Sequence, residues 1–314
     1  MTAYIGRRLL ALIPLLLIIS AIVFGLTFLI PGDPARALAG FKAPQLRVVL
    51  IRHQLGLDRP IVIQYLRWLG HAVRGNLGTS LLKNSPVAAA LRARLPVTLS
   101  MALGGLAVTV LIGVPVGILA GTRPGAVADK VATVGTSAAI AVPDFWLAMV
   151  LVVVFAVKLH WLPAIGYVGI TQSPVAWASH LYMAWIALGL NQGAALARQV
   201  RSSLIDVLDQ DYIRTAAAKG LRRRTIIGKH ALKNAAIVPL TLIGIQFAYL
   251  LGGTIILENI FSAPGLGQYF FLALNGKDLP VIQGVILVVA LTFVLVNLAV
   301  DVLYAYVNPK VRLT

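Results

Sequence analysis

The sequence predicts an all-α polytopic membrane protein with about six transmembrane helices. Two observations lead to this class. The 314-residue chain is 59% hydrophobic and only 12% charged, whereas a soluble domain has about 25% charged residues. The apolar residues also gather in long runs, and a helix that crosses the hydrocarbon core needs about 20 of them. The excess apolar surface is therefore expected to face lipid.

Six apolar runs define the predicted spans. They are Leu9–Ile30, Thr98–Gly121, Val131–Val157, Leu181–Leu204, Ala235–Leu257 and Val281–Tyr306. The run Leu181–Leu204 is the weakest, because it contains two amide side chains and ends among arginines. The third run contains Pro143, which lacks a backbone N–H and marks a place where the helix is expected to break.

Positive charge gives the expected orientation of the spans. Lys and Arg gather before the first span, after the last span and in the loops at 122–130 and 205–234. Because cytoplasmic loops are rich in Lys and Arg, both termini are predicted to be cytoplasmic. The predicted organisation is 1–30 for the N-terminus and first span, 31–97 for a long extracytoplasmic segment, and 98–314 for a core membrane domain that holds the second to sixth spans and the cytoplasmic loop 205–234.

The predicted extracytoplasmic segment contains ten Lys or Arg, but long segments are translocated largely regardless of charge. Within it, Ile61, Tyr65, Trp68 and Leu69 recur at helical spacing. Two interpretations remain open for this helix. It is either an amphipathic cap on the membrane surface or a docking surface for an external partner.

Several functional classes are disfavoured by the sequence. The formal net charge of +17 is accounted for by cytoplasmic loops, and no compact basic domain suggests a nucleic-acid partner. Cysteine is absent and the five His are scattered, so no thiolate or His-based metal site is expected. The phosphate-binding pattern G-x-x-x-x-G-K-[ST] does not occur. The chain is not expected to be an enzyme or to hydrolyse ATP by itself.

The loop 205–234 has the pattern of a helical elbow. Asp209 or Asp211 is expected to cap a helix start with its carboxylate, and Gly220 to end that helix in the left-handed conformation. A second helix is expected to begin near Thr225. The alanines from position 216 onward would form a thin face that fits a groove on another protein. A solvated basic loop is the alternative interpretation.

The elbow resembles the EAA loop of ABC importer permeases, in particular that of the dipeptide and oligopeptide permease subfamily. The subfamily pattern D-Y-I-R-T-A-x-A-K-G-L is matched by Asp211, Tyr212, Ile213, Arg214, Thr215, Ala216, Ala218, Lys219, Gly220 and Leu221, and the downstream H-A-L-x-N by His230, Ala231, Leu232 and Asn234. The Glu of the general motif falls on Arg214 here. The resemblance implies that the ATPase-coupling residues are Asp211, Tyr212, Arg214, Thr215, Ala216, Ala217, Lys219, Gly220 and Leu221.

Further matches to this subfamily extend over nearly the whole chain. Those at the ends of the chain and in the predicted external segment are Tyr4–Leu9, Ile30–Ala35, Leu55–Pro60, Gly75–Ser80, Asp301–Ala305 and Asn308–Arg312. The last external loop matches through Glu258, Phe261, Pro264, Gly265 and Gly267.

The resemblance implies a type I permease fold in a bacterial inner membrane. The expected partners are a homologous second permease subunit that completes a heterodimer, two ATP-binding subunits that carry ATP and Mg, and an extracytoplasmic binding protein that delivers peptides. No cofactor is expected in this chain. A different cargo, such as a nickel chelate or glutathione, is an alternative within the same class. A stand-alone secondary transporter is a second and weaker alternative, because only one carboxylate lies deep in a span.

Polar side chains inside the spans are the candidates for the substrate pathway, since such groups usually face the protein interior. They are Asp144, Asn191, Gln192, Gln246 and Tyr249. A carboxylate such as that of Asp144 would suit a substrate amine. The competing interpretation is that these groups only form hydrogen bonds between neighbouring helices.

Overall fold

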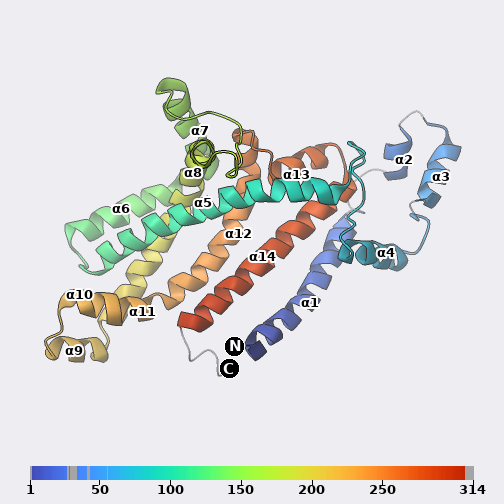
Figure 1. The fold of residues 1–314 in the computed structure, drawn as a ribbon. Helices are drawn as coiled ribbons and strands as arrows, with labels where there is room; N and C mark the ends of the chain where they lie inside the picture. The colour runs from blue at the N-terminus through green and yellow to red at the C-terminus, as the bar shows by residue number, and fades with distance from the viewer. Residues whose placement is uncertain (1, 27, 29–33, 41–42, 55, 308–314) are drawn as a thin grey trace. The chain divides into compact units, whose positions relative to one another are not determined.

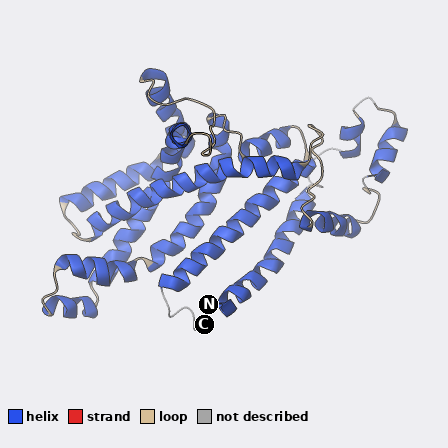
Figure 2. Cartoon of the chain, in the orientation of Figure 1, coloured by secondary structure: helices blue, strands red, loops and turns tan. Residues whose placement is uncertain are grey.

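The computed structural model describes residues 2–26, 28, 34–40, 43–54 and 56–307. The all-α prediction is confirmed, because this part of the chain consists of helices and connecting loops with one isolated bridge between Thr79 and Pro86 (Figure 2). The residues 30–33 of the predicted first-span exit, Leu55, and the C-terminal match Asn308–Arg312 lie outside the described residues.

The helices follow one another along the chain as labelled in Figure 1. They are α1 Thr2–Leu26, α2 Pro34–Ala39, α3 Gln45–Gln54, α4 Ile61–Val73, α5 Val87–Gly121, α6 Val127–Ala141, α7 Asp144–Leu151, α8 Pro174–Leu208, α9 Asp211–Ala218, α10 Arg223–Thr225, α11 Leu232–Ala235, α12 Ile237–Ile260, α13 Leu266–Asn275 and α14 Leu279–Val307. The π-helical segments Val152–Lys158 and Ile226–Ala231 continue α7 and α10.

The chain divides into two compact units. The first unit is built around Val97–Ala263 and includes residues 2–5 and 295–307, and the second comprises Gly6–Pro96 and Pro264–Val294. Residues 264–294 of the predicted core domain thus group with the predicted extracytoplasmic segment. The helix that contains the second predicted span begins at Val87, eleven residues before the predicted start at Thr98.

Three helices of the described part are long and apolar enough to cross a membrane: α5, α12 and α14 over Leu279–Val300. A fourth crossing results if α6 and the helix Asp144–Lys158 count as one broken span. The first predicted span contributes the shorter apolar stretch Leu12–Gly25. The fourth predicted span lies within the 35-residue α8, which is long enough but more polar.

The third predicted span breaks at Pro143, as the sequence indicated. The two helices on either side are bent by 94°. Val142 is extended, with ψ of 121°, because a residue before proline is disfavoured in the helical region. Pro143 is extended too, with ψ of 139°. The Asn191 side-chain amide of α8 donates to the carbonyl of Ile140 at 3.0 Å. It therefore satisfies one of the carbonyls that the end of α6 leaves without a helical partner.

The first unit is held together by close contact between α5 and α8. A Cβ on Gly113 would lie 2.8 Å from the carbonyl oxygen of Gly193. Conversely, a Cβ on Gly189 would lie 2.6 Å from the carbonyl oxygen of Gly105. Thr109 donates from its hydroxyl to the carbonyl of Gly189 at 3.3 Å. The small residues of α5 thus allow the two backbones to meet.

The second unit has a core of its own around α13 and the first turns of α14. It includes Leu91, Leu266, Tyr269 and Val285. The buried carboxylate of Asp278 accepts from the Ser80 hydroxyl and from the backbone N–H groups of residues 81 and 82. These bonds fix the loop that precedes α5 against the turn between α13 and α14.

Replacing Gly117 tests the α5–α8 contact. A Cβ there would lie 2.6 Å from Cβ of Val200 and 2.7 Å from the carbonyl oxygen of Ala197. Gly117→Ala should destabilise the protein by about 1–3 kcal/mol, the usual cost of overpacking. Gly135→Ala in α6 is the control, because its Cβ would meet nothing within 4 Å. Thermal unfolding in detergent measures both, and equal unfolding temperatures would contradict the packing described here.

Candidate functional site

The predicted elbow is present as α9, a tight turn and the helical segment that begins with α10 (Figure 1). Its interior is a small apolar core. Ile213 and Ala216 of α9 pack with Leu204 of α8, with Ile226 and with Ala231, all of which are buried. The elbow is therefore ordered by contacts within this chain, and α9 does not depend on a partner for its position.

The start of α9 corrects the predicted cap. Gln210, with ψ of 146°, occupies the capping position and makes no side-chain capping bond. The carboxylates of Asp209 and Asp211 instead face the guanidinium of Arg214, at N···O distances of 3.3 and 3.7 Å. The two carboxylates were expected to accept hydrogen bonds from backbone N–H groups at the helix start. They are paired instead with the guanidinium of Arg214, one turn along the helix. These pairs are exposed and contribute little to stability.

The end of α9 confirms the role predicted for Gly220. Its φ is +77°, a conformation that costs other residues about 1–2 kcal/mol. Leu221 N–H donates to the carbonyl of Ala216 at 3.3 Å, and Gly220 N–H donates to that of Ala217 at 2.9 Å. This pair of bonds is a Schellman motif, which satisfies the last carbonyls of a helix and reverses the chain sharply.

Two side-chain bonds connect the elbow to its surroundings. Asn234 donates from its amide to the Tyr212 hydroxyl at 2.9 Å, which joins the second helical segment to α9. Arg223 donates to the carbonyl of Thr122 in the loop that follows α5. Tyr212 and Asn234 both belong to the pattern identified in the sequence, so this part of the motif has a structural function within the elbow.

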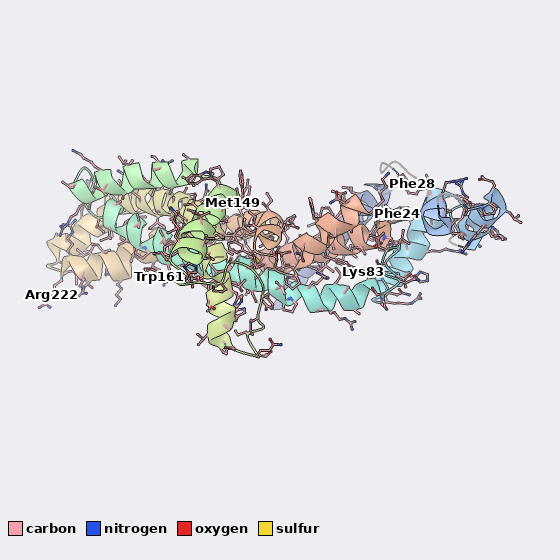
Figure 3. All side chains as sticks on the ribbon, turned by 90° about the horizontal axis from the view of Figure 1, so that it is seen from above. Phe24, Phe28, Lys83, Met149, Trp161 and Arg222 are labelled. Atoms are coloured by element: carbon pink, nitrogen blue, oxygen red, sulfur yellow. The ribbon has the colours of Figure 1, made fainter. Side chains whose placement is uncertain are left out.

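The predicted coupling residues are divided between the buried and the exposed face of the elbow. Ala216 points into the core of the elbow with 8% of its surface exposed, so the thin outer face does not include it. The exposed members are Asp211, Tyr212, Arg214, Thr215, Ala217, Lys219, Gly220 and Leu221. Arg222 lies at the outer tip of the elbow in Figure 3. The outer face is thus polar and basic, with small residues near its centre.

A bidentate ion pair joins α6 to α8 in the turns that lead to the elbow. Arg201 donates to both carboxylate oxygens of Asp129, with Nη2 at 2.8 Å. Asp129 also accepts from the backbone N–H of Gly125 at 2.9 Å. One turn away, Arg198 donates to the Ser137 hydroxyl at 2.6 Å. This two-point geometry fixes the orientation of both groups as well as their separation.

The polar residues predicted for the pathway have different environments. Asn191 is engaged at the break after α6. The buried Gln246 donates from its amide to the backbone carbonyl of Gln192 at 2.9 Å, while its own Oε1 has no partner among the described residues. The Gln192 side chain is half-buried, and Tyr249 is exposed on α12. Asn191 and Gln246 therefore do connect neighbouring helices.

Asp144 differs from the other pathway candidates. It is the first residue of α7, directly after the break at Pro143, and it is half-buried. Its Oδ2 lies 3.8 Å from the position that a Cβ would take on Gly253 of α12. In the part of the chain that the structure describes, no hydrogen bond or ion pair to this carboxylate is found.

The residues that match the family in the last external loop are divided between the two units. Glu258 is fully buried at the end of α12 and accepts from the Thr98 hydroxyl of α5 at 2.6 Å. The carbonyl of the buried Phe261 accepts from the Gly166 N–H at 2.8 Å. In the second unit, Pro264 is exposed, Gly265 precedes α13 and Gly267 is buried in its first turn. Glu258 and Phe261 thus have structural contacts within the first unit.

Comparison with known proteins gives the family. The family described as "Binding-protein-dependent transport system inner membrane component" matches residues 113–313, and its N-terminal family matches residues 1–102. The chain belongs to this family. It is the permease subunit of an ABC importer and a protein of the bacterial inner membrane.

Relatives of this permease are similar over its whole length. A Brucella abortus (strain 2308) protein with the name of a peptide transport system permease is 41% identical over 312 residues, 99% of each chain. The glutathione transport system permease protein GsiC of Salmonella paratyphi A is 40% identical over 312 residues, again 99% of each chain. An inward-facing structure of the MetNI methionine ABC transporter has a TM-score of 0.55 at 21% identity, over 69% of this permease and 96% of that chain. The last comparison shows the shared fold.

Three polar residues of the permease were not identified from the sequence. They are Thr98, Asp129 and Arg201, which form the contacts of α5 and α8 with their neighbours. Asp129 could have been noticed, because it is a carboxylate at the start of a predicted span with basic residues nearby in the sequence. Thr98 gave no such signal, since threonine is common in apolar helices.

Proposed function

We propose that this permease forms one half of the translocation pathway of an ATP-driven importer and couples to separate ATPase subunits through the elbow. The observation that carries the proposal is the outer face of α9, presented by a helix whose position is fixed by its own core and its Schellman turn. A docking element that is ordered before contact avoids the cost of ordering on binding. It also transmits displacement, because the packed core behind it does not deform easily.

The proposed orientation puts the elbow and both termini in the cytoplasm. The elbow segment carries a dense group of basic side chains, at positions 214, 219, 222, 223, 224, 229 and 233. Such a concentration is expected on the cytoplasmic side of a membrane. ATP and Mg would be bound by the ATPase subunits, and a homologous second permease subunit would complete the pathway as a heterodimer. An extracytoplasmic binding protein would deliver the cargo.

The proposed cargo is di- or oligopeptides. The relatives named for peptide and for glutathione transport are similar at 41% and 40% identity, so glutathione, a tripeptide, is the second candidate. Both cargoes have an amino group and a carboxylate that are charged at neutral pH. The carboxylate of Asp144, which has no ion-pair partner in the described part of the chain and is placed at a helix break beside a glycine, suits such an amine. Gln192, Gln246 and Tyr249 are proposed to line the same pathway, with Asn191 at the break.

Enlarging Ala217 tests the docking role of the elbow. Its side chain is exposed, so Ala217→Leu should leave the fold intact while filling space that an ATPase subunit would occupy. Binding of the ATPase subunits should weaken about tenfold or more, which corresponds to about 1.4 kcal/mol. Peptide uptake into proteoliposomes should fall with it.

The matched control is Ala128→Leu, an exposed alanine in the first turn of α6 outside the elbow. It should retain normal ATPase binding and uptake. If Ala217→Leu also retained both, the outer face of α9 would not be the docking surface.

Neutralising Asp144 tests the pathway. Asp144→Asn removes the charge with little change of shape, and an ion pair at 4 Å contributes about 1–4 kcal/mol between bulk water and a protein surface. Uptake of peptides with a free amino terminus should fall, whereas uptake of N-acetylated peptides should stay the same. Equal uptake of both classes by the variant and the parent protein would remove Asp144 from the pathway.

A further inference from the structure

The second unit contains an amphipathic helix that no contact within the unit fully covers. α4 has no buried residue. One side of it packs on the end of α1, where Phe24 lies 5.6 Å from the Tyr65 ring and 5.8 Å from the Trp68 ring between centroids. Tyr65 also shares a 2.8 Å hydrogen bond with the Ser20 hydroxyl. α4 is therefore attached firmly to α1 along this side.

The other two sides of α4 are separate apolar and polar stripes. Val62, Leu66 and Val73 are 67%, 58% and 80% exposed, and their spacing places them on one side of the helix. Arg67 and His71, both exposed, lie one turn apart on the neighbouring side. A folded protein in water does not usually leave a helix with an apolar stripe of this kind facing solvent.

The position of the α4 contact along α1 indicates its depth in a membrane. At 1.5 Å per residue, Phe24 lies about 22 Å along the axis from Leu9, where the apolar run begins. The hydrocarbon core is about 30 Å thick. The contact with α4 is therefore close to the far boundary of the hydrocarbon. Phe28 packs edge-on against Phe24, with 5.4 Å between the ring centroids, and the two residues lie close together in Figure 3.

α1 also has exposed apolar side chains at the level of its contact with α4. Ile18 and Ile22 are 58% and 57% exposed, on a helix whose apolar length suits contact with lipid. They lie two residues from Ser20 and Phe24, the residues that hold α4, and therefore on the opposite face of α1. An apolar surface suited to lipid and the exposed stripe of α4 thus belong to the same unit, at the same level along α1.

We propose that α4 lies in the plane of the membrane interface, with Val62, Leu66 and Val73 inserted among the acyl chains and Arg67 and His71 at the phospholipid headgroups. An interfacial helix of this kind is buried about 5–10 Å at the boundary between headgroups and acyl chains, which agrees with the depth given by α1. Tyr65 and Trp68 then lie at the level where aromatic side chains are enriched in membrane proteins. The partner is the bilayer, and the surface is not a docking site for another protein.

The insertion can be measured directly because the chain has no native cysteine. Single variants Val62→Cys and Leu66→Cys would carry the environment-sensitive fluorophore NBD on the apolar stripe. Arg67→Cys and His71→Cys would carry it on the polar stripe as matched controls. Each full-length variant would be reconstituted into phosphatidylcholine–phosphatidylglycerol vesicles with and without a nitroxide-labelled phosphatidylcholine as quencher.

The proposal predicts blue-shifted emission and strong quenching at positions 62 and 66, with weak quenching at 67 and 71. Water-like emission at all four positions would overturn it. Protection of 62 and 66 only after a binding protein is added would also overturn it, and would assign the surface to that protein. Equal strong quenching at all four positions would overturn the interfacial pose, because the polar stripe would then be in hydrocarbon.

Discussion

Close backbone contact between α5 and α8 is the constraint on which the first unit depends. The small residues of α5 let the two helices meet from Gly105 down to Gly121, where a Cβ would come within 3.2 Å of Cβ of Leu204. Leu204 is itself part of the elbow core. The packing therefore continues without interruption from the middle of the helices to the base of α9, so a displacement of α9 would be passed to α8 by packed atoms.

The elements whose causes are local in the sequence were predicted well. Pro143 stands at the break between α6 and α7, and its missing N–H and its ring are properties of the residue itself. Gly220 ends α9 for a similar reason. Pro115, by contrast, lies inside α5, which continues through it. The start of α9 was predicted wrongly, because three neighbouring polar residues could each have occupied the capping position. Gln210 occupies it, while the carboxylates of Asp209 and Asp211 face Arg214.

The elements that depend on contacts between distant residues could not be predicted. Asn191 satisfies a carbonyl 51 positions earlier in the chain, and nothing in the sequence near Asn191 indicates that partner. The inward position of Ala216 was recoverable, since it follows Ile213 by three residues and so shares its face. The prediction placed the alanines from position 216 onward on one outer face, because the family pattern contains them together. It therefore did not separate the buried Ala216 from its exposed neighbours.

The most direct test of this account is chemical cross-linking from neighbouring positions of α9 to the ATPase subunits. Thr215→Cys and Ala216→Cys place a single thiol on the exposed and on the buried face of the same helix. Membranes that contain the whole importer would be treated with a short thiol-to-amine cross-linker. If the outer face of α9 docks on the ATPase, Thr215→Cys gives a product with the ATPase subunit and Ala216→Cys gives none. No product from Thr215→Cys, or equal products from both, would contradict it.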